Sequence, residues 1–496
     1  MRENIENFDV VVIGGGPGGS TAATILAMQN NQVLLLEREK FPRYQIGESL
    51  LPATIHGIGR ILGLSEELKN AGFVRKLGGT FRWGSNPTPW TFAFSTASTI
   101  SAPKAYAYQV ERSKFDDILL KNAAHKGVDV REEHAVKNLL FEDGRACGVE
   151  FVDENGNPGR ATAKYIIDAS GHQSHIYKHV GERIYSNFFQ NLALFGYYEN
   201  GERFPPPGDG NIFCAAFEEG WFWYIPLSAT LTSVGAVVAK EHAEQLKGGY
   251  EQAMDHFIAS CPEISRMLAN AHRVTEGVYG QLRVRKDWSY SNARFWVPGL
   301  VLIGDAACFI DPVFSSGVHL ATYSALLAAR SINSIINDGM DESRCFEEFE
   351  RRYRREFRNF YEFLSAFYDM HQHEDSYFWR ARKVLNSEQS IQEAFVTLVA
   401  GGSSLYDEDL LVDTTHIERI KQELRQLENT EEEPAPYFAR EKEAFLDVLV
   451  AEATQMQTQA SVGAKRGDEK PLFKGGLIPS ADGFRWREVT VVAAGQ

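Results

Sequence analysis

Apolar and small residues come in short runs over the first part of the chain, and polar residues separate the runs. Residues 9–13 are mostly β-branched and apolar, as in a buried strand, and a second apolar run covers 32–36. Between them, residues 20–28 have the small and apolar composition of a packed helix. The order of strand, helix and strand within one short stretch predicts a βαβ unit with parallel strands.

Later segments of the chain also show the patterns of strands and helices, but strands dominate. Residues 128–151 alternate as in a sheet, with turn sequences at Asp143-Gly144 and Asn155-Gly156, and 165–171 predict a further buried strand. Aromatic and β-branched residues dominate between 175 and 285, where we expect antiparallel strands at 192–198, 212–217, 221–226 and 233–238. A strand at 300–303 then precedes a long amphipathic helix at 318–336.

These segments predict an α/β chain with three parts. The first part is discontinuous and comprises 1–175 and 285–340, which hold the βαβ unit and the strand before the long helix. The second part, 176–284, is an antiparallel sheet. The third part, 341–496, is a mostly helical region, in which 455–475 have the Gln-, Gly-, Lys- and Ser-rich composition of a flexible segment.

Composition narrows the class of protein. The 496 residues carry a net charge of −15, which argues against binding to the phosphates of nucleic acids. No apolar stretch reaches the length of a membrane span, and the first seven residues are polar, so we expect a cytoplasmic protein without a membrane partner. The five cysteines lie far apart without C-x-x-C spacing, which suggests neither a disulfide framework nor a zinc site.

A glycine-rich turn joins the first strand to the first helix. Gly14, Gly16 and Gly19 form G-x-G-x-x-G, with Pro17 inside the motif. Glycine is needed because the turn requires backbone angles that a Cβ disfavours and because a pyrophosphate must approach the main chain. Glu37 ends the second strand, where a carboxylate accepts ribose hydroxyls. This arrangement predicts a dinucleotide with a free 2′-hydroxyl, so FAD or NAD rather than NADP.

Further polar groups follow other predicted elements. Asp305 comes after the strand at 300–303, where its carboxylate can bond a ribityl hydroxyl. Ser316 and Gly317 open the long helix, so their free amides predict an anion site. Arg112 stands before a predicted helix at 113–125, where it could reach a cofactor phosphate. The loop 41–49 leaves the βαβ unit directly and could lie against the same cofactor.

Two patterns are ambiguous on their own, and one is dismissed. Lys76 lies in a stretch rich in glycine and aromatic residues, and without other evidence it would be interpreted as an ordinary surface cation. Without other evidence, the bulky residues 221–226 indicate only the core of a sheet. His371 and His373 suggest a metal, but helical neighbours two apart do not share a face and no third ligand is in register. We therefore expect no metal site.

Taken together, these motifs resemble those of the flavin-dependent halogenases, whose FAD fold is shared with the aromatic hydroxylases. The resemblance covers about residues 6–385. It rests on four features: the glycine turn with Glu37; the segment Lys76-Leu-Gly-Gly-Thr-Phe-Arg-Trp-Gly84; Trp221-x-Trp223-x-Ile225-Pro226; and Gly304-Asp305 with Pro312 and Ser315-Ser316-Gly317. The glycine turn alone is common to many flavoproteins, whereas the lysine segment together with W-x-W-x-I-P is specific.

The resemblance implies a Rossmann-like FAD fold of the aromatic-hydroxylase (GR2) type, with the antiparallel sheet on the substrate side. In that family FADH2, supplied by a separate flavin reductase, reacts with O2 and with chloride or bromide to give hypohalous acid. Lys76 would then direct the oxidant onto an aromatic ring, either as an ammonium that hydrogen-bonds hypohalous acid or as a neutral amine that is chlorinated to a chloramine. Ser316 and Gly317 would hold the halide. Trp221, Trp223, Ile225 and Pro226 would form a barrier between substrate and flavin. The implied FAD contacts are Gly14, Gly16, Pro17, Gly19, Glu37, Arg38, Glu48, Ser49, Arg112, Asp305, Pro312 and Gly317.

One departure from the family pattern concerns the substrate. Tryptophan halogenases have a glutamate immediately before Ser-Thr-Gly, and this chain has Phe314 at that position. The sequence therefore resembles the branch that acts on phenols and pyrroles, often while they are tethered to a peptidyl carrier protein in nonribosomal peptide or polyketide biosynthesis. A carrier-bound tyrosyl or similar ring, or a small free phenol or pyrrole, is the substrate we expect.

Two alternatives remain open at this point. An NAD(P)H-dependent FAD aromatic hydroxylase would share the glycine turn, Asp168 and Asp305, but its flavin must meet both substrate and nicotinamide, which the W-x-W-x-I-P motif would obstruct. A non-catalytic FAD-holding protein that docks a carrier domain would need neither Lys76 nor the halide-holding residues Ser316 and Gly317.

Overall fold

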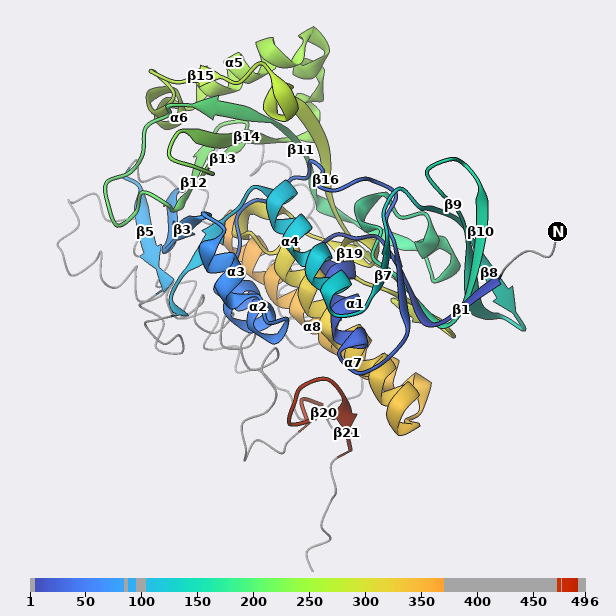
Figure 1. The fold of residues 1–496 in the computed structure, drawn as a ribbon. Coiled ribbons are helices and arrows are strands. Elements are labelled where there is room, and N and C mark those ends of the chain that lie inside the picture. Colours follow the sequence, from blue (N-terminus) through green and yellow to red (C-terminus); the bar gives the residue numbers. More distant parts are fainter. Residues whose placement is uncertain (1–4, 84–87, 95–103, 370–470, 474, 489–496) are drawn as a thin grey trace, which may run out of the picture.

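The computed structural model describes residues 5–83, 88–94, 104–369, 471–473 and 475–488. His371 and His373, and most of the segment 455–475, lie outside these residues. Within them, two large sheets and eight α-helices form the molecule, which confirms the predicted α/β class (Figure 1).

The first sheet contains the βαβ unit. Its parallel centre is formed by β1 (Ile5–Ile13), β2 (Val33–Leu36) and β10 (Pro158–Asp168), and Ile13 is in register with both Leu36 and Asp168. The carboxyl ends of these strands therefore meet at one edge, as does that of β18 (Leu300–Leu302). The remaining strands are β7 (Asp129–Arg131), β8 (Ala135–Glu142), β9 (Arg145–Val152) and β17 (Trp296–Val297).

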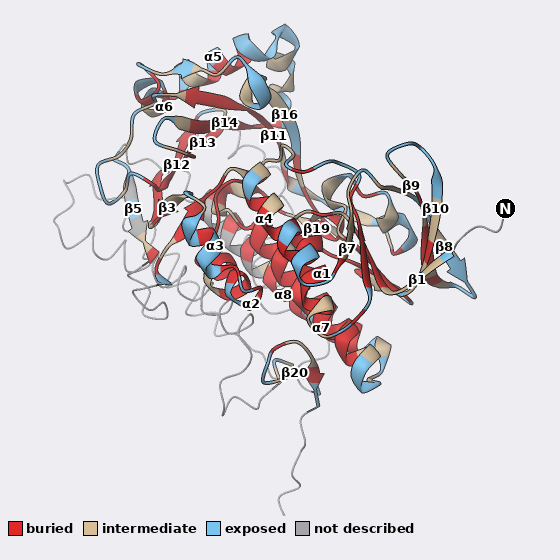
Figure 2. Ribbon diagram, in the orientation of Figure 1, coloured by how far each residue is buried: buried red, intermediate tan, exposed pale blue. Residues whose placement is uncertain are grey.

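Two helices cover this sheet at the centre of the molecule. α1 (Pro17–Ala27) packs against α7 (Gly317–Asp338), and both are buried over most of their length because small and aliphatic side chains line them (Figure 2). α8 (Glu342–Asp369) packs against α7 in turn. Other helical segments are η1 (Ala53–Ile58), α2 (Gly59–Ile61), α3 (Ser65–Asn70), α4 (Arg112–His125), η4 (Gly171–Gln173), η5 (Ile176–His179), η7 (Gly277–Tyr279), η8 (Gly304–Ala306) and η9 (Pro312–Phe314), and three more accompany the second sheet.

The second sheet lies over the helices α4 and α7 (Figure 1). Its order is β19 (Cys308–Phe309), β16 (Arg283–Asn292), β11 (Arg183–Glu199), β14 (Leu231–Ala239), β13 (Gly220–Pro226), β12 (Ile212–Phe217), β4 (Gly78–Arg82) and β5 (Trp90–Ala93), and β15 (His272–Arg273) pairs with β11. The four strands predicted between 192 and 238 are confirmed. Strands from outside 176–284 also join this sheet, and the division into domains stays a prediction.

Alternation along β13 decides what each face of the second sheet contacts. Trp221, Trp223 and Ile225 belong to the central core, whereas Phe222 and Tyr224 pack in a separate cluster. That outer cluster includes residues of α5 (Tyr250–Ser260) and α6 (Pro262–Met267), which follow η6 (Lys240–Gly248) and cover the outer face. The strand period of two thus turns the tryptophans of the motif toward the first sheet.

Two small sheets complete the described chain. β3 (Val74–Lys76) pairs with β6 (Ala107–Gln109), and β20 (Ile478–Pro479) pairs with β21 (Trp486–Arg487). Beyond 340, the described residues are therefore helical up to Asp369 and form short strands between 478 and 487. No helix among the described residues is long and apolar enough to cross a membrane.

Candidate active site

A cavity of about 700 Å³ lies where the edge of the first sheet faces the second sheet. This volume is within the range of about 300–1,000 Å³ that is usual for ligand and cofactor sites. The structure brings most of the predicted site residues to its wall: Gly14, Gly16, Pro17, Glu37, Arg38, Glu48, Ser49, Arg112, Trp221, Trp223, Ile225, Asp305, Pro312 and Gly317. Gly19, Lys76, Ser316 and Pro226 are not part of the wall, so their roles depend on neighbours.

The glycine turn has the geometry that close approach of a pyrophosphate requires. Gly14 has φ +103°, a left-handed conformation that favours glycine. A Cβ on Gly19 would lie 1.8 Å from the carbonyl oxygen of Gly14, so no other residue fits there. α1 begins at Pro17, and its first amides have no acceptor within the helix. The turn and the helix end therefore fit the diphosphate of FAD.

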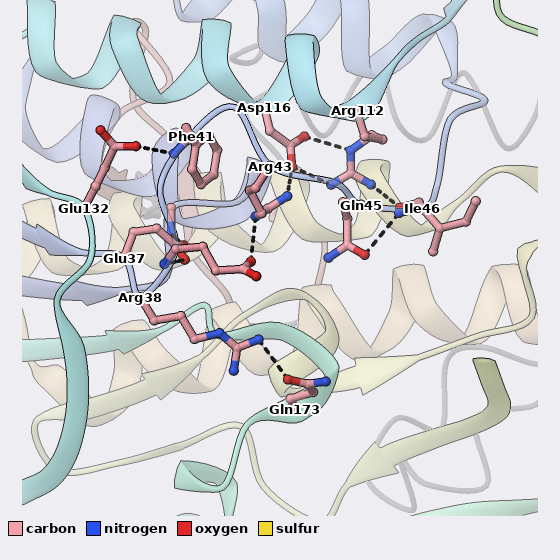
Figure 3. A network of polar contacts seen from close by, with 12 residues as sticks. Glu37, Arg38, Phe41, Arg43, Gln45, Ile46, Arg112, Asp116, Glu132 and Gln173 are labelled. Atoms are coloured by element: carbon pink, nitrogen blue, oxygen red, sulfur yellow. Dashed lines mark hydrogen bonds and ion pairs between the residues drawn. The ribbon is translucent and has the colours of Figure 1, made fainter. Parts of the chain in front are cut away.

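Glu37 is held rigidly at the end of β2. Its Oε2 accepts a hydrogen bond from the N–H of Gly15 at 2.6 Å, and its Oε1 accepts from the N–H of Glu39 at 2.8 Å. The side chain is buried, and the neighbouring Arg38 donates to Gln173 Oε1 at 2.8 Å across the cavity (Figure 3). The Glu37 carboxylate thus lies beside the turn at the place where a ribose would be bound.

Arg112 is engaged by the protein itself. It is the first residue of α4, and its Nε and Nη2 donate to the two oxygens of Asp116 at 2.7 and 2.9 Å. Its Nη1 donates to the carbonyl of Ile46 at 2.5 Å. These contacts hold the loop 43–49 against the cavity, and contact of Arg112 with a cofactor phosphate stays a prediction.

Arg43 is a cation that the sequence did not identify. Its Nη1 donates to Asp116 at 2.9 Å, and Figure 3 shows both arginines directed at this aspartate. A Cβ on Gly16 would lie 3.5 Å from Arg43 Nη2, so the guanidinium stands directly beside the glycine turn. Arg43 is therefore better placed for the pyrophosphate than Arg112. Only its position in the loop after Glu37 could have suggested this.

Lys76 is buried, with 2% of its surface exposed. β3 pairs with β6, and on the other side of β6 Ser49 bridges to Gln109, so the backbone itself brings lysine and serine together. Nζ donates to Ser49 Oγ at 2.9 Å, to the carbonyl of Leu50 at 3.1 Å and to Ser315 Oγ at 3.4 Å. Burial lowers the pKa of Lys76 to about 7. Near neutral pH the amine can thus hold or release a proton.

The loop before α7 forms a second site for an anion. Ser315 adopts φ +60°, which turns the chain so that α7 begins at Gly317. Ser316 is fully buried, and its Oγ has no hydrogen-bond partner among the described residues. An unpaired buried hydroxyl at the positive end of a long helix fits a small anion such as a halide.

The two motif tryptophans are buried and line the cavity. Trp221 Nε1 donates to the hydroxyl of Tyr368 at 2.8 Å, and Trp223 Nε1 donates to Ser233 Oγ at 3.1 Å. Their indole rings are thus fixed by hydrogen bonds as well as by packing. Pro226 ends β13 away from the wall.

Several carboxyl groups besides Glu37 lie at or near the cavity: Glu48, Asp287 and Asp311 are buried, and Asp305 is half-buried. Burial raises the pKa of Glu48 to about 7 and that of Asp305 to about 6. Glu48 Oε1 accepts from Tyr197 at 2.8 Å. Asp287, which the sequence did not identify, has no hydrogen-bond partner for either oxygen among the described residues, and burial raises its pKa well above the usual range. Burial likewise raises the pKa of Asp311, its neighbour, to about 6. Asp287 lies in β16, a strand that the sequence did not predict, so the sequence offered no signal for it.

Among the residues that the structure describes, no cluster of three or more His, Cys, Asp or Glu side chains could hold a metal ion.

Comparisons with known proteins agree on one family. A family model described as "Tryptophan halogenase" matches residues 9–102 and 96–420. The Tryptophan 2-halogenase of Chondromyces crocatus is 33% identical over 408 residues, which cover 80% of this chain and 76% of that protein. The solved structure of the myxobacterial chondrochloren halogenase CndH, a variant of FAD-dependent halogenases, is 53% identical with a TM-score of 0.78 and covers 97% of this chain and 100% of its own. The flavin-dependent halogenase CmlS is 30% identical with a TM-score of 0.75, over 98% and 84%.

Proposed function

The chain belongs to the tryptophan halogenase family of flavin-dependent halogenases, and we propose that within this family it chlorinates an electron-rich phenol or pyrrole ring. The enzyme uses FAD, which a separate flavin reductase reduces, together with halide and O2. Bound FAD supplies, with O2, the oxidising equivalent that converts halide to hypohalous acid.

The position of Lys76 carries the proposal for the chemical step. Its ammonium is almost fully buried and contacts Ser49 and Ser315, which both line the cavity. Lys76 therefore lies one hydroxyl away from the cavity, in which we expect the oxidant to be made. From there it would orient hypochlorous acid against the substrate ring. A C–Cl bond forms, the ring C–H bond breaks, and the released proton leaves with hydroxide as water.

Ser316 and the first amides of α7 would hold the halide before it is oxidised. The positive end of the helix and the unpaired hydroxyl offset part of the loss of hydration of the ion. Trp221 and Trp223 would keep the organic substrate out of the cavity, because their rings are buried in its wall and fixed by hydrogen bonds. Separation of oxidant formation from ring chlorination follows from this arrangement.

The choice of a phenol or pyrrole rests on Phe314. A phenyl ring here lies 6.4 Å from that of Phe81 and offers no carboxylate to the substrate. A ring that is already electron-rich needs less help from a base. The chain is also more similar to the chondrochloren halogenase, at 53% identity, than to the Tryptophan 2-halogenase, at 33%. We further propose a peptidyl carrier protein as the bearer of the ring and the cytoplasm as the location.

Mass spectrometry of reaction products tests this proposal. Reactions contain the full chain, FAD, a flavin reductase, O2 and chloride or bromide, and compare tyrosyl carrier protein, free tyrosine, pyrrole-2-carboxylate and free tryptophan. We expect halogenated phenol or pyrrole, and no product from Lys76→Ala, which should still bind FAD. Lys69→Ala, which removes an exposed lysine, is the matched control. Preferred halogenation of tryptophan would overturn the proposed substrate class. NAD(P)H without the reductase should not bleach the bound flavin.

A further inference from the structure

Tyr368 joins three elements that are far apart in the sequence. It lies in the last turn of α8 and is buried, with 4% of its surface exposed. Its hydroxyl accepts from Trp221 Nε1 at 2.8 Å and donates to Asp311 Oδ2 at 2.8 Å. Helix α8 is thereby connected to β13 of the second sheet and to the residue that precedes η9.

Asp311 in turn shapes residues 312–316, the loop before α7 that contains the proposed halide site and is called the halide loop here. Its Oδ1 accepts from the N–H of Val313 at 3.0 Å and so caps η9, and Asn191 Nδ2 approaches Oδ2 at 3.3 Å. η9 leads directly into Ser315, whose hydroxyl accepts from Lys76. The conformation of the halide loop therefore depends on a carboxylate that Tyr368 helps to hold.

The ring of Tyr368 is fixed independently of its hydroxyl. It packs edge-on against Trp83 at 5.5 Å, Phe189 at 5.3 Å and Phe188 at 6.0 Å between ring centres. Trp83 also lies 6.2 Å from Trp221. These contacts leave the hydroxyl little freedom, so it marks one defined point between the indole and the carboxylate.

A hydroxyl suits this point for a chemical reason. An indole N–H can only donate a hydrogen bond and an ionised carboxylate can only accept one, whereas a phenol hydroxyl does both at once. Removal of the hydroxyl would leave a buried donor and a buried acceptor each without this partner.

We propose that Tyr368 is a positioning residue, whose hydroxyl fixes the halide loop relative to Trp221. In this arrangement the bound halide does not leave its site before it is oxidised. This inference rests on the proposed function of these two parts of the site. It adds the end of α8, which the family motifs do not include, to the parts that control halide use.

The test compares two substitutions on the same helix. Tyr368→Phe removes the hydroxyl and keeps the ring. Tyr361→Phe is the matched control, because Tyr361 also lies on α8, packs against Phe189 at 5.2 Å and bonds Ser186 Oγ at 2.9 Å. Hypochlorous acid is captured with a small β-diketone, so that the chloride KM is measured without knowledge of the aromatic substrate.

For Tyr368→Phe we expect the chloride KM to rise about tenfold, as for loss of a hydrogen bond to a charged group, and kcat to change less than twofold. More peroxide should be released per reduced flavin consumed. Tyr361→Phe should leave the chloride KM within twofold. Equal changes in both variants, or a fall in melting temperature without a change in chloride KM, would overturn the inference.

A second readout uses the protein without flavin. The tryptophan emission spectrum should shift in Tyr368→Phe, and the same change in a Trp221→Phe background should produce no shift. An unchanged spectrum would show that the hydroxyl does not hold Trp221. If the wild type produces hypochlorous acid but no halogenated phenol or pyrrole, the proposed substrate is wrong, while the chloride measurements still judge Tyr368.

Discussion

Helices α1 and α7 both begin at the same cavity, yet the residues around their first turns differ. At α1, glycines expose the backbone, and the guanidinium of Arg43 stands beside Gly16. At α7, the hydroxyls of Ser315 and Ser316 precede the helix, and the nearby cation is Lys76. The helix ends offer similar partial charges, so we attribute the proposed difference in function to the side chains.

The two cations suit two kinds of anion. A pyrophosphate keeps its charge throughout the reaction, and an arginine, which is always protonated, can hold it permanently. Halide and its oxidised form change charge and proton content during the reaction. A lysine whose pKa burial lowers to about 7 can follow such a change, because both protonation states are accessible. Under the proposed function, the comparison thus separates a site that binds the cofactor from a site that takes part in the chemistry.

The largest effect should come from replacing Lys76, the cation beside α7, with arginine, the permanently charged residue type found beside α1. In Lys76→Arg the charge no longer changes near neutral pH, and we expect the halogenation rate to fall on the order of 10³-fold, as for loss of an acid–base group. FAD affinity, measured by fluorescence titration, should stay within twofold. Lys76→Met, which fits the buried site without charge, controls for packing. If Lys76→Arg kept more than a tenth of the wild-type rate, the distinction between the two cations would be contradicted.

The next effect concerns the glycine turn. In Gly19→Ala, the added Cβ would meet the carbonyl oxygen of Gly14 at 1.8 Å, so the turn must open. We expect FAD affinity to fall by about 100-fold, or about 2.7 kcal/mol. Gly72→Ala is the control: it also has a positive φ, +75°, but an added Cβ meets nothing within 4 Å. Normal FAD binding by Gly19→Ala would show that the close approach is not needed.

The smallest effect is on stability and tests the state of Lys76 itself. An unfolded lysine has a pKa of about 10.4, whereas burial lowers the folded pKa to about 7. The unfolded chain therefore binds more protons between these values, and Lys76 makes stability rise with pH in this window. Lys76→Met should be more stable than wild type at pH 6 by a few °C in melting temperature, and the gap should shrink toward pH 10. A constant gap would mean that the folded pKa is not lowered.

Local patterns predicted the nucleotide half of the molecule well. The strand at 9–13, the glycine turn and the helix after it interact over short distances in the sequence, so their residue types alone carry the signal. The antiparallel strands between 192 and 238 were predicted for a similar reason, since each shows its own composition. Burial of Lys76 was not predictable from its neighbours, which read as a surface segment without the family resemblance.

The sequence did not predict the residues whose roles depend on partners far away in the chain. Arg43 and Asp287 lie in ordinary loop and strand segments, and only the fold places them at the cavity wall. Arg112 carried a signal for phosphate, but Asp116 on the next turn of the same helix and the Ile46 carbonyl occupy its donors. Tyr368 lies in the region expected to be mostly helical, and nothing in the sequence indicated that its hydroxyl would bridge two motifs.

By itself the sequence determined the dinucleotide turn, the ends of the strands that present it and the alternation that sorts the two faces of β13, because these depend on backbone geometry within a few residues. Only the tertiary structure decided the lysine site. Lys76 meets Ser49 across 27 positions and Ser315 across 239. The pKa of the amine is set by the burial that those long-range contacts create, and burial is a property of the packed chain rather than of any segment in it.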